Sequence, residues 1–259
     1  MADVQEIADG IYRISTFIPE ANLAFNQFLI DDEKPLLFHT GQRMLFPGTL
    51  EAVKSVIDPA RLRYVSWSHL EADECGALNE FLAVAPLAEP IHGEIGKMIG
   101  IDDFSSRPAT PMSDGDVLDL GKHKLRFLIT PQVPHAWDAI LAFEETTGTL
   151  LASDLFTQSG ERRATTEGDM VDLTVHTHAM FPGYIPIGDH TWRVFDRLEA
   201  LAPRTLACMH GPSYTGDGAG ALRDLRTALA GVATDAPAAA RTAAGAHRRC
   251  LRAPPAAVK

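Results

Sequence analysis

The stretch Ser68-His69-Leu70-Glu71-Ala72-Asp73-Glu74-Cys75-Gly76 places four side chains that can bind metal ions within six residues. An apolar run precedes it and is typical of a buried strand, and the residues after it have the apolar spacing of a helix. The cluster therefore lies at the carboxyl end of a predicted strand. In an extended segment alternate side chains point the same way, so His69, Glu71 and Asp73 can share one side. The stretch indicates half of a site for two metal ions.

Length and composition predict one α/β domain. The chain has 259 residues and is 46% hydrophobic, which is enough for one domain with a sizeable core. We expect that domain to span residues 1–232. Residues 233–259 are rich in Ala, Arg and Pro without apolar periodicity, which is typical of a disordered tail. No apolar run is long enough to cross a membrane and the first residues are acidic, so we expect a cytoplasmic protein without a membrane partner.

The charge and the cysteines exclude several classes of function. The net charge is −11, and residues 231–259 carry five cationic side chains and one acidic one, so the remaining chain carries −15. A body this acidic repels phosphate backbones, which makes nucleic acid a poor partner. The three cysteines show no CxxC spacing, so neither a disulfide framework nor a thiolate zinc site is expected.

The order of predicted elements indicates two β-sheets packed face to face. A hairpin around Asp9-Gly10 is followed by strands, then a helix, then the strand before the metal-binding stretch. Further elements are expected as a helix over 91–101, strands over 116–120, 124–130, 138–143 and 149–152, no regular structure over 160–188, a helix over 190–201, a strand over 205–209 and a helix over 220–232. This order predicts an αββα sandwich of two mixed sheets flanked by helices.

Three later positions join the first cluster. His135 follows a predicted strand in a loop that contains Pro131 and Pro134, and Asp154 and His210 each follow a predicted strand of their own. If these strands run the same way, their ends bring the three side chains to one edge with the 68–76 stretch. The candidate metal-binding residues are then His69, Glu71, Asp73, Glu74, His135, Asp154 and His210.

This pattern resembles a known family. His-x-Glu-x-Asp, followed by widely separated His, Asp and His at strand ends, is similar to the metallo-β-lactamase fold in its flavodiiron or oxygen-binding di-iron branch. Met209-His210-Gly211-Pro212 is also similar to that branch. The resemblance implies two iron ions, with manganese or zinc as alternatives. It implies that His69, Glu71 and His135 bind one metal, that Asp73 and His210 bind the other, and that Asp154 bridges both.

The donor types favour redox chemistry. Imidazole with hard carboxylates and no thiolate suits iron or manganese better than structural zinc. Hydrolases of this fold carry histidine where Glu71 stands, and a carboxylate there stabilises higher oxidation states. We therefore expect binding, and reduction, of dioxygen or nitric oxide. A non-catalytic oxygen sensor or carrier is one alternative, and a dinuclear zinc or manganese hydrolase is another.

The chain departs from the family at two points. Glu74 stands where histidine is usual, and either binds the second metal or only begins a helix, whose N-terminus favours acidic residues. Flavodiiron enzymes also carry a flavodoxin-like domain after the metal domain, whereas this chain continues with a helix and a tail. The resemblance then implies an external electron-donor protein, and it implies a possible homodimer. His176 and His178 are expected in a loop near the site, and His39 and Asp138 as possible support for the ligands.

Overall fold

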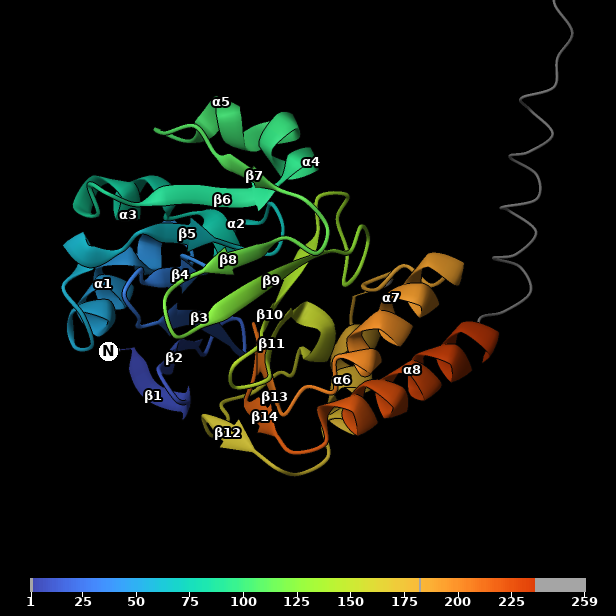
Figure 1. Ribbon diagram of the computed structural model, residues 1–259. Helices are drawn as coiled ribbons and strands as arrows, with labels where there is room; N and C mark the ends of the chain where they lie inside the picture. Colours follow the sequence, from blue (N-terminus) through green and yellow to red (C-terminus); the bar gives the residue numbers. More distant parts are fainter. Residues whose placement is uncertain (1, 182, 236–259) are drawn as a thin grey trace, which may run out of the picture.

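The computed structural model describes residues 2–181 and 183–235. Over these residues the chain forms two seven-stranded β-sheets that stack face to face, with helices on the outer faces (Figure 1). Both sheets contain parallel and antiparallel pairs. The predicted αββα sandwich of two mixed sheets is therefore confirmed. Most of the predicted tail, from residue 236 onward, lies outside the described residues.

The first sheet has the strand order β1-β2-β3-β4-β5-β6-β7. Its strands are β1 (Asp3–Ala8), β2 (Ile11–Ile18), β3 (Leu23–Ile30), β4 (Leu36–Phe38), β5 (Tyr64–Ser66), β6 (Glu89–Gly93) and β7 (Thr110–Met112). Strands β1 to β4 pair antiparallel and β4 to β7 pair parallel. The hairpin predicted around Asp9-Gly10 joins β1 to β2, and Gly10 adopts a φ of 71°, which glycine tolerates without strain.

The second sheet has the strand order β12-β14-β13-β11-β10-β9-β8. Its strands are β8 (Val117–Asp119), β9 (Lys124–Ile129), β10 (Ile140–Glu144), β11 (Thr149–Ser153), β12 (Thr165–Thr166), β13 (Thr205–Cys208) and β14 (Ser213–Thr215). Strand β10 is antiparallel to both β9 and β11, and β11 is parallel to β13. Strands β9, β11 and β13 therefore run the same way, and their carboxyl ends share one edge.

Helices cover the outer face of each sheet. The helices are α1 (Phe46–Lys54), α2 (Ala72–Cys75), α3 (Leu78–Val84), α4 (Glu94–Gly96), α5 (Asp102–Phe104), α6 (Val171–Ala179), α7 (Asp189–Ala200) and α8 (Gly218–Asp235), with shorter 3₁₀ turns at Arg43–Leu45, Pro59–Arg61 and Asp154–Phe156 and a π-helical segment at Lys97–Ile101. Helices α1 and α3 pack on the first sheet, and α6, α7 and α8 pack on the second. None of the described helices is both long and apolar enough to span a bilayer.

The central strands β4 and β11 are buried on both faces, which explains their apolar runs. In β4, Leu36 and Phe38 face the core between the sheets, while Leu37 faces the helices. In β11, Leu151 faces the same inner core and its neighbours Leu150 and Ala152 face the helices. A strand covered on both sides has no polar alternation, so it appears in the sequence as a continuous apolar run.

Two predicted segments differ from the structure. The predicted helix over 91–101 begins as strand β6, and helical turns start only at Glu94, because a short apolar run fits a buried strand as well as a helix. The 160–188 segment, expected without regular structure, contains α6 and the short strand β12. Helix α6 buries Thr174, Thr177 and His178, so its buried face lacks the apolar periodicity that marks a helix.

We expect Phe127→Ala to lower the free energy of unfolding by about 3–5 kcal/mol, because Phe127 is fully buried between the sheets and its loss leaves a cavity. Val117→Ala on the neighbouring strand is the control, since Val117 is exposed and should change stability by less than about 0.5 kcal/mol. Urea unfolding of chelator-treated protein measures both. Equal effects of the two substitutions would contradict the placement of Phe127 in the core.

Candidate metal centre

The first group of candidate side chains follows β5. His69 is fully buried three residues after the strand, and Glu71 is the residue before α2, with extended backbone angles. Helix α2 begins at Ala72, so Asp73 projects from a helical turn instead of the extended segment that the sequence predicted. The segment is held to the second sheet, because the Ile140 N–H donates to the Ser68 carbonyl oxygen at 2.8 Å.

The other candidate side chains follow three strands of the second sheet. His135 lies in the loop between β9 and β10, Asp154 follows β11, and His210 follows β13. The parallel direction of these strands brings the three side chains to the edge where His69 lies. Ser153, just before Asp154, has a φ of 49°, a strained conformation for a residue with a side chain. Such strain persists only where the surrounding structure enforces it and is common at functional sites.

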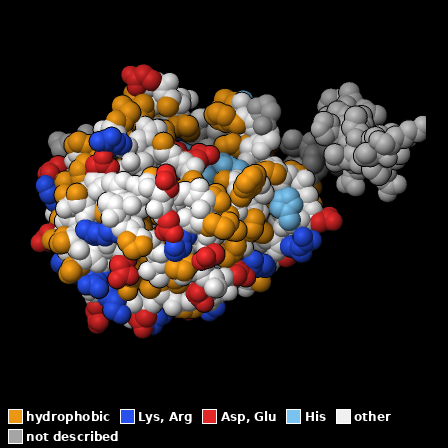
Figure 2. Space-filling model, turned by 90° about the horizontal axis from the view of Figure 1, so that it is seen from above, with side chains coloured by type: hydrophobic (Ala, Val, Ile, Leu, Met, Phe, Trp, Pro, Cys, Tyr) orange, Lys and Arg blue, Asp and Glu red, His pale blue; other side chains and the backbone are white. Residues whose placement is uncertain are grey.

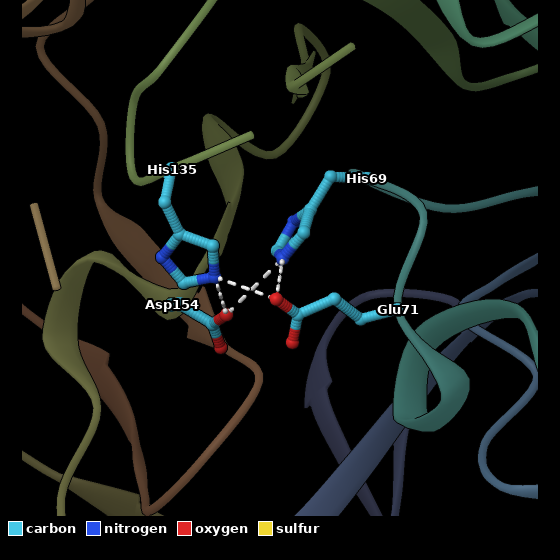
Figure 3. A group of neighbouring side chains, drawn as sticks. All are labelled: His69, Glu71, His135 and Asp154. Atoms are coloured by element: carbon cyan, nitrogen blue, oxygen red, sulfur yellow. Dashed lines mark ion pairs between the residues drawn. The ribbon is translucent and has the colours of Figure 1, made fainter. Parts of the chain in front are cut away.

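Four of these side chains form a compact group. His69, Glu71, His135 and Asp154 offer donor atoms that all lie within 4.8 Å of one another (Figure 3). His135 Nε2 lies 3.3 Å from both Glu71 Oε1 and Asp154 Oδ2. His69 Nε2 lies 3.5 Å from Glu71 Oε1 and 3.6 Å from Asp154 Oδ2. In Figure 3 the two imidazoles and the two carboxylates converge on one point, which a single cation could occupy.

A second group shares Asp154 with the first. His210 Nε2 lies 3.3 Å from Asp73 Oδ2 and 3.4 Å from Asp154 Oδ1. The two oxygens of Asp154 therefore face different groups, Oδ2 toward the first and Oδ1 toward the second. This division is what a carboxylate between two cations requires.

The three histidines are held from behind by their Nδ1 atoms. His135 Nδ1 lies 3.1 Å from the carbonyl oxygen of Tyr184, and His210 Nδ1 lies 2.8 Å from that of Ala24. His69 Nδ1 lies 2.8 Å from Ser68 Oγ and 3.2 Å from a carboxylate oxygen of Glu74. An acceptor at Nδ1 fixes the proton there in the neutral imidazole, which leaves Nε2 free to bind a metal ion.

The donor set fits a pair of metal ions. His69 Nε2 and Asp154 Oδ1 are buried and have no hydrogen-bond partner, and such orphaned polar atoms are costly unless something polar satisfies them. The converging donors are imidazole nitrogens and carboxylate oxygens, which suit iron, manganese or zinc. The Cys75 thiol donates to the Glu71 carbonyl oxygen and takes no part in the group.

Glu74 is placed differently from the other six candidates. Its side chain is 1% exposed and accepts hydrogen bonds from the main-chain N–H groups of Ser68 and His69. Its carboxylate lies on the Nδ1 side of the His69 ring, whereas the other carboxylates lie on the Nε2 side. His39 Nε2 lies 3.5 Å from Glu74 behind the site, and burial lowers the pKa of His39 to about 3, so this imidazole is neutral.

The remaining predicted residues do not join the two groups. Asp138 accepts a hydrogen bond from the Leu70 N–H and lies 3.9 Å from His92, so it supports the 68–76 stretch instead of a ligating imidazole. His176 and His178 lie on α6 and not in a loop. His176 is exposed, and the buried ring of His178 packs on Tyr184.

An aromatic wall beside the metal centre was not predicted from the sequence. A cavity of about 380 Å³ is lined by Leu23, Glu71, His135, Asp154, Thr157, Phe181, Gly183, Tyr184 and His210. Tyr184 packs edge-on against His135, and its hydroxyl lies 2.8 Å from Thr157 Oγ1. In Figure 2 the face seen from above shows histidine side chains beside apolar ones. No motif marks Tyr184, because its role depends on a contact across almost fifty residues.

The carboxylates shift the pKa values of the histidines. Burial lowers the pKa of His69, but Glu74, Glu71 and Asp154 outweigh burial and raise it to about 10. Burial also lowers the pKa of His210, which Asp73 and Asp154 raise to about 9. Hydrogen bonds from His135 and His69 hold the pKa of Glu71 well below its usual range. Protons on His69 and His210 and bound cations are therefore alternative ways to offset the carboxylate charge.

We expect metal binding at pH 7 to release at least two protons, because a metal ion needs neutral His69 and His210 and both pKa values lie above 7. Zinc affinity should rise with pH from 7 to about 10. Calorimetry in buffers of different ionisation enthalpy measures the protons. Zinc binding without proton release would contradict these pKa values.

The same shifts predict how the stability of chelator-treated protein depends on pH. The pKa values of His69 and His210 are both raised above the ordinary 6.5. The contribution of these two charged imidazoles to the free energy of unfolding is therefore complete below pH 6.5 and is lost as pH rises through about 9 to 10. Urea unfolding between pH 6 and pH 10.5 should show this loss. His69→Gln should flatten the alkaline part of the curve, and an unchanged curve would contradict the assignment.

Comparison with known proteins identifies the family. Residues 23–211 match the family model described as ODP family beta lactamase. The flavo-diiron protein FprA2 of Clostridium acetobutylicum is 27% identical over 82% of this chain and 58% of its own length. The rubredoxin-oxygen oxidoreductase of Megalodesulfovibrio gigas is 27% identical over 74% of this chain and 49% of its own length. The anaerobic nitric oxide reductase flavorubredoxin of Salmonella arizonae is 30% identical over 58% of this chain and 32% of its own length. This chain thus spans from 32% to 58% of the length of these curated relatives.

Solved structures agree on the fold. Rubredoxin oxygen:oxidoreductase from Desulfovibrio gigas superposes with a TM-score of 0.77 at 21% identity, over 88% of this chain and 62% of that chain. The flavodiiron core of Flv1 from Synechocystis sp. PCC6803 gives a TM-score of 0.76 at 21% identity, over 88% of this chain and 61% of that chain. The resemblance to the flavodiiron branch of the metallo-β-lactamase fold is confirmed. Because the family match covers most of its length, this chain belongs to the ODP family of β-lactamase-like proteins.

Proposed function

We propose that this chain holds two iron ions, with which it binds dioxygen or nitric oxide and reduces it using electrons from a separate donor protein. The observation that carries the proposal is the position of Asp154, whose two oxygens face two different groups of donors. The names of the relatives support the substrate class, since they include a rubredoxin-oxygen oxidoreductase and a nitric oxide reductase. In this proposal residues 1–232 form the metal domain.

The proposed ligands follow from the two groups of donors. His69, Glu71 and His135 would hold one metal ion, Asp73 and His210 would hold the other, and Asp154 would bridge them. The carboxylates supply anionic oxygen donors, which favour the higher oxidation state of iron over a zinc hydroxide site. The name flavo-diiron protein of a relative supports iron over manganese or zinc.

The rest of the site shapes a small, mostly apolar cavity. When bound, an iron pair supplies the position at which the gas binds and the route for electrons to it. Leu23 and Phe181 give the cavity apolar walls that suit a small uncharged molecule. The Thr157 hydroxyl donates to the Asp154 carbonyl oxygen at 3.0 Å, so the Tyr184 hydroxyl donates to Thr157. This chain of hydrogen bonds holds the backbone of the bridging residue in place.

One observation also favours a non-catalytic oxygen sensor or carrier. The Tyr184 carbonyl oxygen accepts from His135 Nδ1, so the 160–188 segment is attached directly to a proposed ligand. A change at the metal centre that moves His135 would move this segment and any partner bound to it. A homodimer remains a prediction, which sedimentation of the intact chain would check.

Oxygen consumption separates the candidate functions. With iron loaded and reductant in excess, we expect continuous consumption of well over about ten equivalents of oxygen or nitric oxide per chain, since a reductase turns over. A carrier or sensor would stop after about one equivalent per site. Hydrolysis of an ester or phosphodiester by the zinc form, with an inert iron form, would overturn the proposal.

We expect Asp154→Ala to remove both metal ions, because each group loses a shared donor and the remaining ligands lose their alignment. Elemental analysis should fall from about two metal ions per chain to near zero. Asp172→Ala on α6 is the control, since its side chain is exposed and should leave the content unchanged. Full metal content in Asp154→Ala would exclude the bridging role.

A further inference from the structure

Glu74 is a buried carboxylate surrounded by hydrogen-bond donors. The His69 N–H donates to it at 2.7 Å and the Ser68 N–H at 3.1 Å. The Ser68 hydroxyl donates to it at 2.6 Å, and the Ser153 hydroxyl at 3.0 Å. With His69 Nδ1 at 3.2 Å, these donors occupy the lone pairs that a carboxylate offers. A carboxylate satisfied in this way has little capacity left for a metal ion.

The direction of the Glu74 side chain also separates it from the metal centre. His69 presents Nε2 to Glu71 and Asp154 and presents Nδ1 to Glu74. The two nitrogens lie on different edges of a rigid ring, so Glu74 and the converging donors lie on opposite sides of it. Asp73, the preceding residue on α2, points to His210 instead. Successive residues of a helix are rotated by roughly 100°, which explains why the two neighbours diverge.

Glu74 also connects the two sheets behind the site. Ser68 and His69 follow β5 of the first sheet, and Ser153 ends β11 of the second. The Ser68 hydroxyl donates to the Glu74 carboxylate, and the Ser153 hydroxyl lies 2.5 Å from Ser68 Oγ and 3.0 Å from the same carboxylate. Ser153 is the strained residue whose conformation sets the direction of Asp154. One carboxylate therefore supports both His69 and the backbone that carries Asp154.

We propose that Glu74 is a positioning residue, which orients His69 and Asp154 from behind, and that it does not bind the second metal ion. The inference rests on the proposed di-metal function. It makes the two metal positions unequal, since His69, Glu71, His135 and Asp154 surround one, and Asp73, His210 and Asp154 surround the other. The position with fewer protein donors keeps more room for an external ligand. Glu74, which stands where the family usually has histidine, thus supports the metal position of His69 instead of the position of Asp73 and His210.

The test uses the intact chain loaded with zinc, which is diamagnetic, and ¹⁵N-labelled histidine. The His69 Nδ1–H should give a downfield proton signal that exchanges slowly with solvent, because it donates to a buried carboxylate. His69→Gln identifies that signal. Glu74→Gln should keep about two zinc ions per chain at saturation, shift the signal upfield and weaken zinc binding about 10–100-fold, which is typical for loss of a group that orients a ligand.

Two controls isolate the effect. Glu71→Gln changes a proposed metal donor, so it should weaken zinc binding while the His69 Nδ1–H stays bonded to Glu74. Glu144→Gln changes another fully buried carboxylate, which lies 3.2 Å from His123 Nδ1 away from the site, and should leave both readouts unchanged. Saturation of Glu74→Gln at about one zinc ion, with an unmoved His69 signal, would overturn the proposal.

A milder variant tests the same proposal if Glu74→Gln does not fold. Ser153→Ala removes one donor to Glu74 and should shift the His69 signal in the same direction by a smaller amount, with about two zinc ions retained. An unmoved signal in this variant would also overturn the proposal. Both readouts use zinc and do not depend on oxygen reduction. If the iron-loaded chain fails to consume oxygen, the proposed function is wrong, but the role of Glu74 is still tested.

Discussion

A carboxylate buried where two sheets meet must be offset by positive charge or by hydrogen-bond donors, and Asp154 imposes this constraint on the whole edge. Its side chain is 4% exposed, and an unpaired charge in that position would cost several kcal/mol. Histidines therefore face both of its oxygens. Each histidine is held in turn by an acceptor behind it, so the requirement extends outward to Tyr184, Ala24 and Glu74.

Much of the fold could be predicted because its strands are apolar runs that end at polar residues. The turn at Asp9-Gly10 and the runs before His69, Asp154 and His210 are local signals, and each corresponds to a strand or turn in the structure. Helix α6 could not be found this way, because the side chains it buries are polar. The sequence predicts a helix where β6 ends, since a run of a few apolar residues has no distinct period.

The convergence of the candidate side chains could be predicted from the sequence, but their orientations could not. Histidine and carboxylate at strand ends are visible in the sequence, and six of the seven candidates converge. The carbonyl oxygens of Ala24 and Tyr184 that hold two histidines leave no trace there, since every residue has a carbonyl group. The direction of Glu74 depends on where α2 begins, and a shift of one residue would turn it by roughly 100°.

The two groups of donors are assembled from residues far apart in the chain, the first at His69 and the last at His210. A ribosome releases the amino-terminal donors early, but β11 gains its parallel partner β13 only after residue 205 has emerged. A chain that terminates before residue 205 lacks both that partner and His210. Both groups of donors can therefore be complete only after His210 has been synthesised.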